Sequence, residues 1–155
     1  MKAQDLMTHP AVTCHVNDSL SAAAQKMWDH DCGALPVVND EGRVTGMITD
    51  RDICMAACIQ GRRLDELLVN CAMGRHVVTV GLEQTIAQVA QLMAEHQIRR
   101  LPVVDEDDLP VGVISLNDLA IEAVQPGTQM TGGVSKVAHA LAAICQHRMQ
   151  TQEAA

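Results

Sequence analysis

The stretch LPVVNDEGRVTGMITDRD at residues 35–52 returns 66 residues later as LPVVDEDDLPVGVISLND at residues 101–118. When the chain is aligned with itself at this offset without a gap, 14 of the 47 residues from 7 to 53 are identical to their partners. Average composition would give roughly three identities. The chain therefore contains a duplication. Because a half of this size buries too little apolar surface to be stable alone, we expect the two halves to pack about a pseudo-twofold axis and share one core.

Each copy predicts the same order of elements, β-α-β-β-α. Capping residues before periodic apolar runs predict the helices, and short β-branched runs joined by turns predict a hairpin. In the first copy the expected elements are 12–16, 20–30, 35–39, 43–48 and 50–60, and in the second they are 77–80, 85–96, 101–104, 111–115 and 116–124. The fold class is thus α/β of the α+β type, with two repeats and an additional C-terminal helix.

The duplication divides the chain into four parts, namely a first motif (1–61), a linker (62–72), a second motif (73–125) and a tail (126–155). Leu64, Leu67 and Leu68 predict a short helix in the linker. In the tail, one face of an amphipathic helix that ends near Arg148 is formed by Val134, Val137, Ala138, Leu141, Ile144 and Cys145.

Composition narrows the class of protein. The formal net charge of −8 argues against a nucleic-acid surface, which needs a basic patch. The sequence contains no apolar run of membrane-spanning length and no secretory h-region at its start, so we expect a cytoplasmic protein without a membrane partner.

Cysteine usage points away from disulfides and metal. The six cysteines contain no C-x-x-C pair, and we expect buried, inert thiols. Cys54 and Cys58 would share a helix face at a spacing able to bind metal, but no third ligand lies nearby in the sequence, so no metal site is predicted. A metal- or redox-responsive protein that uses these cysteines and the histidines is the less favoured alternative.

Two patterns recur at corresponding positions and admit two interpretations each. Pro36 and Pro102 stand second in the middle strand, which indicates either an ordinary edge strand or a strand left open beside a ligand. The second pattern, Gly-x-Ile-[Thr/Ser]-x-x-Asp, ends at Asp52 and Asp118. Its hydroxyl and carboxylate form a capping box, or they face a phosphate and a ribose diol at a helix N-terminus.

Three arginines accompany these patterns, and their arrangement differs between the copies. Arg51 lies at the first helix start, where the second copy has Asn117, whereas Arg99 and Arg100 precede only the second strand pair. They are either solvated charges or forks for phosphate oxygens. Two ligand clefts built from the copies would therefore not be equivalent. No nucleophile with an activating base, phosphate-cradling loop or catalytic metal triad is visible, so the chain is predicted not to be an enzyme.

The blocks HDCGALPVV at 30–38 and HQIRRLPVV at 96–104, together with the two Gly-x-Ile-[Thr/Ser]-x-x-Asp patterns, resemble the tandem cystathionine-β-synthase (CBS) motifs of a Bateman module, in particular its small stand-alone bacterial type. The resemblance implies a regulatory sensor whose two clefts between the motifs bind adenosine-containing ligands, namely AMP, ADP, ATP or S-adenosylmethionine. It also implies a homodimer formed through helices, and a regulated protein partner of unknown identity. The alternative is a ligand-free structural or interaction protein, in which both aspartates only cap helices.

The same resemblance assigns roles by position. Asp52 and Asp118 would bind ribose hydroxyls, Thr49 and Ser115 would meet phosphate, and Arg51 and Asn117 would stand beside them. The adenine would be walled by Thr13, Thr79, the segment 32–36 with Cys32, Ala34 and Pro36, and the segment 99–102 with Arg99, Arg100 and Pro102. The chain has no Phe and no Tyr, so aliphatic and Met side chains would have to hold a planar ligand.

Overall fold

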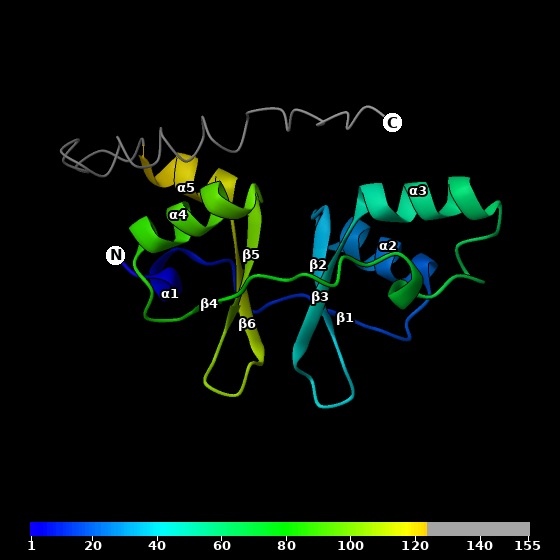
Figure 1. Ribbon diagram of the computed structural model, residues 1–155, viewed down its shortest axis with the longest axis horizontal. Coiled ribbons are helices and arrows are strands. Elements are labelled where there is room, and N and C mark those ends of the chain that lie inside the picture. Colours follow the sequence, from blue (N-terminus) through cyan, green and yellow to red (C-terminus); the bar gives the residue numbers. More distant parts are fainter. Residues whose placement is uncertain (124–155) are drawn as a thin grey trace, which may run out of the picture.

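The computed structural model describes residues 1–123 (Figure 1), and the predicted C-terminal helix lies outside these residues. The first repeat contains β1 (Cys14–His15), α2 (Leu20–Asp29), β2 (Ala34–Val38), β3 (Val44–Thr49) and α3 (Asp50–Gln60). The second contains β4 (Val80–Gly81), α4 (Ile86–His96), β5 (Arg100–Val104), β6 (Pro110–Ser115) and α5 (Leu116–Ala123). A short helix α1 (Ala3–Leu6) precedes them, and a 3-10 helix η1 (Val69–Cys71) lies between them. The predicted order β-α-β-β-α is confirmed in both copies.

Each repeat builds one three-stranded sheet, in the order β1-β2-β3 and β4-β5-β6. The first strand pairs parallel with the second, and the second pairs antiparallel with the third. Even the irregularity repeats, because the register shifts between Val37 and Val38 and again between Val103 and Val104. In Figure 1 the sheets stand side by side at the centre, with α2 and α3 on one flank and α4 and α5 on the other.

The two repeats exchange the segments that precede their first strands. Residue 8 pairs with β6 of the second repeat, through Thr8 N–H to the Val113 carbonyl at 2.9 Å and Val113 N–H to the Thr8 carbonyl at 3.0 Å. At the position 66 residues later, Gly74 pairs in the same way with Met47 of β3, at 2.8 and 3.0 Å. The matching bridges confirm the pseudo-twofold relation.

Close backbone approach explains the glycine of the repeated pattern. A Cβ atom on Gly46 would lie 2.6 Å from the carbonyl oxygen of Gly74. A Cβ on Gly112 would overlap the Met7 side chain and lie 3.0 Å from the Thr8 carbonyl oxygen. Glycine therefore lets the exchanged segments lie flat against the third strands.

The single shared core that the sequence predicts is replaced by two clusters, each completed by an exchanged segment. Leu35 and Ile48 centre the first cluster, which the linker supplements with Leu67 and Val69. Leu101 and Ile114 centre the second, which α1 supplements with Ala3. The segment that precedes each repeat therefore fills the core of the other.

The linker helix expected at 62–72 does not form, apart from the three-residue η1. The carbonyls of Leu64 and Leu67 accept hydrogen bonds from the N–H groups of Ser21 and Leu20, at 3.1 and 2.8 Å. These carbonyls satisfy the first turn of α2, which otherwise leaves its N–H groups without partners, so the linker stays extended here.

β2 and β5 are central strands, so the edge-strand interpretation of the repeated proline is wrong. β1 pairs only with Val37 and Val38, and it therefore ends before Pro36. β4 likewise pairs only with Val103 and Val104, beyond Pro102. The alternative, a strand left open at the proline, is confirmed. Among residues 1–123, no helix has both the length and the apolar character needed to span a membrane.

Candidate functional site

A cleft of about 880 Å³ lies where the two repeats meet. It is lined by the exchanged segment 8–12, the turn 30–34 after α2, Arg99 and Arg100 before β5, and residues at the junction of β6 and α5. This volume lies in the range of 300–1,000 Å³ that is typical of small-molecule sites. Both halves of the duplication therefore contribute to one concave surface.

Asp118 stands in this cleft at the first turn of α5 and closes a capping box. Its Oδ2 accepts hydrogen bonds from the Ser115 N–H and the Ser115 hydroxyl, both at 2.7 Å. In return, the Ser115 Oγ accepts the Asp118 N–H at 3.3 Å. Every hydrogen bond found for this carboxylate among the described residues uses Oδ2, so Oδ1 stays available to a donor.

The corresponding pair on α3 has the same geometry. Asp52 Oδ2 accepts the Thr49 N–H at 2.9 Å and the Thr49 hydroxyl at 2.8 Å, and Thr49 Oγ1 accepts the Asp52 N–H. The predicted capping boxes are thus confirmed in both repeats. Because capping occupies only one carboxylate oxygen, it does not compete with ligand binding through the other.

Cationic side chains gather on one part of the cleft wall. Arg99 and Arg100 line it from the second repeat, and His9 and His30 line it from the exchanged segment and from the end of α2. Arg100 reaches to the other repeat, because a Cβ on Gly33 would lie 3.5 Å from its Nη2 atom. Gly33 thus leaves room for a guanidinium that touches both halves of the cleft.

The cleft brings together half of the residues that the sequence singled out. Those that line it are Cys32, Ala34, Arg99, Arg100, Ser115, Asn117 and Asp118. Thr49, Arg51 and Asp52 lie instead at the start of α3.

The remaining predicted residues do not line this cleft. Thr13 precedes β1, where its carbonyl accepts a hydrogen bond from Lys26 Nζ at 3.0 Å, and Thr79 precedes β4. Pro36 and Pro102 are buried within β2 and β5.

Sequence reasoning missed the segment 8–12, which forms one wall, and also His30 and Asp31. A signal for the segment was present, because Met7 and Met73 are among the identical pairs of the duplication. Its meaning depends on a contact with the opposite repeat, and no local pattern reveals such a contact.

The thiols are less buried than predicted. Cys14 is buried, and removal from water raises the pKa of its thiol to about 12. Cys54, Cys58 and Cys71 are exposed, so the expectation of buried thiols is wrong for these three. Cys54 and Cys58 lie on the side of α3 that no described element covers. Between residues 1 and 123, no group of three His, Cys, Asp or Glu side chains is placed to hold a metal ion.

Two copies of one β-α-β-β-α unit, exchanged segments and a cleft between the repeats define a tandem-repeat α+β protein. The chain belongs to the CBS domain family, whose model matches residues 3–58 and 67–124. It is 41% identical over 118 residues to the CBS domain-containing protein YhcV of Bacillus subtilis, which covers 76% of this chain and 82% of that protein.

Two solved structures share the fold. Hypoxic Response Protein I, crystallised with two coordinated zinc ions, matches with a TM-score of 0.71 and 33% identity over 78% of this chain and 98% of that chain. The CBS domain pair of protein MJ0100, in complex with 5′-methylthioadenosine and S-adenosyl-L-methionine, matches with a TM-score of 0.70 and 29% identity over 79% and 94% of the respective chains. A structural neighbour of this chain therefore binds adenosyl ligands.

Proposed function

We propose that this protein is a non-enzymatic regulatory module that binds an adenosine-containing ligand in the cleft beside Asp118. The candidates are AMP, ADP, ATP and S-adenosylmethionine. The observation that carries the proposal is the Asp118 carboxylate, which keeps Oδ1 free while Oδ2 caps α5 at the wall of a cleft of about 880 Å³. The adenosyl ligands of the MJ0100 pair support the same class of ligand.

The groups around Asp118 match the parts of such a ligand. An ionised carboxylate oxygen only accepts hydrogen bonds, which suits the two hydroxyl donors of a ribose. In the first turn of α5, the Leu116 N–H donates to the Arg99 carbonyl and the Asp118 N–H donates to Ser115 Oγ. The N–H of Asn117 is then the group in this turn that can meet an anionic oxygen.

The affinity follows from the surfaces in contact. Trp28 is 84% exposed and does not line this cleft, so adenine is held by aliphatic groups. Burying about 150 Å² of adenine contributes about 4 kcal/mol, and a hydrogen bond to a charged carboxylate adds about 1.5–3 kcal/mol. After association costs of several kcal/mol, the expected dissociation constant is roughly micromolar to millimolar. Such affinity suits the sensing of an abundant metabolite.

Isothermal titration of AMP, ATP and S-adenosylmethionine into the wild type, Asp118→Asn and Asp52→Asn tests the proposal. Asparagine keeps a capping oxygen but replaces the free carboxylate oxygen with an amide donor. We expect saturable binding to the wild type, at least about tenfold weaker binding to Asp118→Asn because a charge-assisted bond is lost, and little change in Asp52→Asn. If no ligand gives heat, the ligand-free interaction protein becomes the better interpretation.

The homodimer, the regulated partner and the cytoplasmic location stay predictions that the family resemblance implies. Sedimentation equilibrium of the full chain, with and without the ligand that the titration identifies, measures the first of these. A monomer under both conditions would contradict it.

A further inference from the structure

Helix α3 carries apolar side chains on two opposite faces. On the inner face, Ile53 and Ala56 are 5% and 8% exposed and belong to the first core cluster. The outer stripe, by which we mean Cys54, Met55, Cys58 and Ile59, is exposed, with Met55 at 45% and Ile59 at 76%. A surface helix normally turns polar residues to water, and a helix that is apolar all round is normally covered on all sides.

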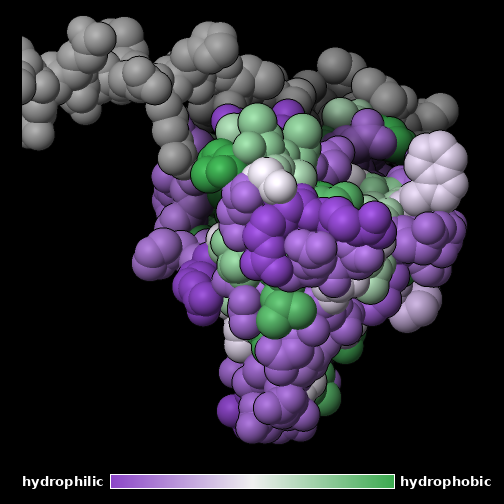
Figure 2. All heavy atoms as spheres, turned by 90° about the vertical axis from the view of Figure 1, so that its right-hand side faces the viewer, coloured by the Kyte–Doolittle hydropathy of each residue, from purple (hydrophilic) through white to green (hydrophobic). Residues whose placement is uncertain are grey.

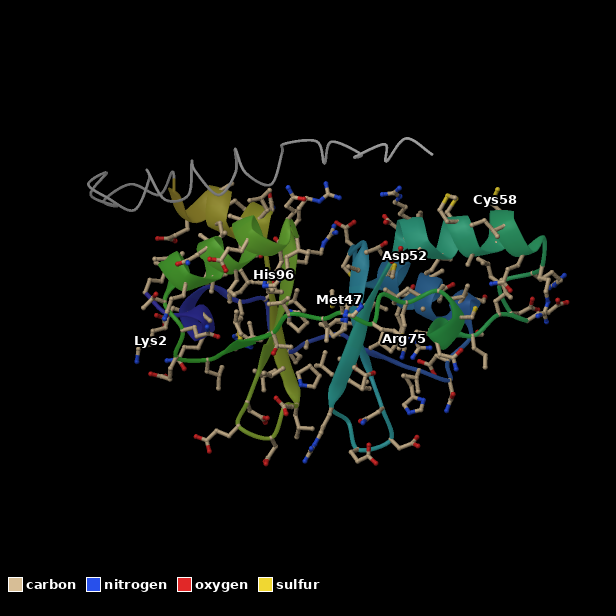
Figure 3. The ribbon with its side chains drawn as sticks, in the orientation of Figure 1. Lys2, Met47, Asp52, Cys58, Arg75 and His96 are labelled. Carbon is tan, nitrogen blue, oxygen red and sulfur yellow. The ribbon has the colours of Figure 1, made fainter. Side chains whose placement is uncertain are left out.

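The figures locate this stripe on the outside of the first repeat. In Figure 3, Cys58 lies on the side of α3 that faces away from the sheets, and Asp52 lies at the end of the helix nearest β2. Figure 2 views the first repeat from its end and shows apolar residues along the upper edge, at the height that α3 has in Figure 1. Among the described residues, none covers the outer stripe, so its occupant lies elsewhere.

The chain itself contains a segment with the complementary pattern. In residues 134–148 the apolar positions that the sequence analysis grouped on one helix face include Val137, Leu141 and Ile144. A helix of this length is about 22 Å long, whereas the 11 residues of α3 span about 17 Å. One such helix is therefore long enough to cover the whole stripe.

The tether is long enough to deliver the segment. Residues 124–133 separate it from the end of α5 and span up to about 33 Å when extended. A folded unit of 123 residues has a radius of gyration of about 14 Å. α3 and α5 also lie along the same side of the two sheets in Figure 1. A segment joined by such a linker acts at an effective concentration of roughly millimolar, well above that of a second molecule in dilute solution.

We propose that residues 134–148 form an amphipathic helix that packs its apolar face on the outer stripe of α3 in the same chain. The proposal gives an occupant to a surface that is otherwise costly to leave in water, and it is independent of any ligand in the cleft. Two cysteines of the stripe, Cys54 and Cys58, then serve as built-in reporters, because a covered thiol reacts slowly with an alkylating reagent.

The test is alkylation of the native full chain with N-ethylmaleimide, followed site by site through peptide mass spectrometry. The wild type is compared with Leu141→Asp, which places a charge on the apolar face, and with Gln146→Asp, which places the same charge on the opposite face. We expect Cys54 and Cys58 to react at least about tenfold faster in Leu141→Asp, because a charge in an apolar contact opens it, and at the wild-type rate in Gln146→Asp. Exposed Cys71 should react equally in all three proteins, and buried Cys14 should stay unreactive wherever the fold is intact.

Two results would overturn the proposal. In the first, Cys54 and Cys58 already react as fast as Cys71 in the wild type, or stay protected in Leu141→Asp. In the second, their protection in the wild type disappears on dilution, which would identify a second molecule as the cover.

Discussion

Replacing Gly46 with alanine tests the segment exchange, the feature that joins the two repeats. The added Cβ would lie 2.6 Å from the Gly74 carbonyl oxygen, whereas ordinary contacts of this kind begin near 3.4 Å. The clash is with backbone, so the exchanged segment must move by most of an ångström. That movement weakens the two hydrogen bonds between Met47 and Gly74, at about 1 kcal/mol each, and overpacking costs about 1–3 kcal/mol. We expect Gly46→Ala to lower the free energy of unfolding by about 2–4 kcal/mol.

Urea unfolding followed by circular dichroism measures this loss. With a slope of about 1.5 kcal/mol per molar urea, the midpoint should fall by about 1.5–2.5 M. Gly81→Ala is the matched control, because a Cβ there meets nothing within 4 Å, and its effect should stay within about 0.5 kcal/mol. Gly112→Ala should fall between them, since the flexible Met7 side chain is its closest neighbour. Equal midpoints for Gly46→Ala and Gly81→Ala would refute the close crossing described above.

Three further predictions concern the cores, a cap and a buried thiol. Leu35→Ala and Leu101→Ala each empty a fully buried site in a different cluster, so each should cost about 3 kcal/mol, and the double variant should lose the sum within about 0.5 kcal/mol in urea unfolding. Thr49→Ala removes the α3 cap and should cost about 1 kcal/mol in thermal unfolding, whereas Thr49→Ser should be nearly neutral. Burial raises the pKa of Cys14 from 9.0 to about 12, so between these pH values only the unfolded thiol ionises and stability should fall by about 1.4 kcal/mol per pH unit. Chemical unfolding of the wild type and Cys14→Ala at pH 8 to 11 checks this, and identical pH profiles would contradict it.

Local patterns carried the prediction of the repeats because the physics of those elements is local. Thr49 with Asp52, and Ser115 with Asp118, are capping boxes that a reader of the sequence can place, and the structure has both. The hairpins at β2-β3 and β5-β6 likewise follow from β-branched runs separated by turn residues. Half of the candidate site residues come from these same positions and meet in one cleft.

The linker and the thiols were predicted incorrectly for a common reason. Leu64 and Leu67 have helical spacing, but their carbonyls are used by the first turn of α2, which is distant in sequence. Cys54 and Cys58 have the composition of buried residues, but the face of α3 on which they lie has no cover among the described residues. Propensity describes what a segment favours alone, and contacts across the fold override it.

The sequence by itself determined the duplication, the order of elements, the helix caps and the aspartates that close them, because each is written in residues close to one another or in an identity that repeats. Only the tertiary structure decided that the segments before the two repeats change places, that Gly46 and Gly112 are needed where they cross, and that residues 8–12 form a wall of the cleft. These are pairings between residues about a hundred or about thirty positions apart. Their free energy comes from packing and hydrogen bonds that exist only after the chain has closed, so no window of sequence contains them.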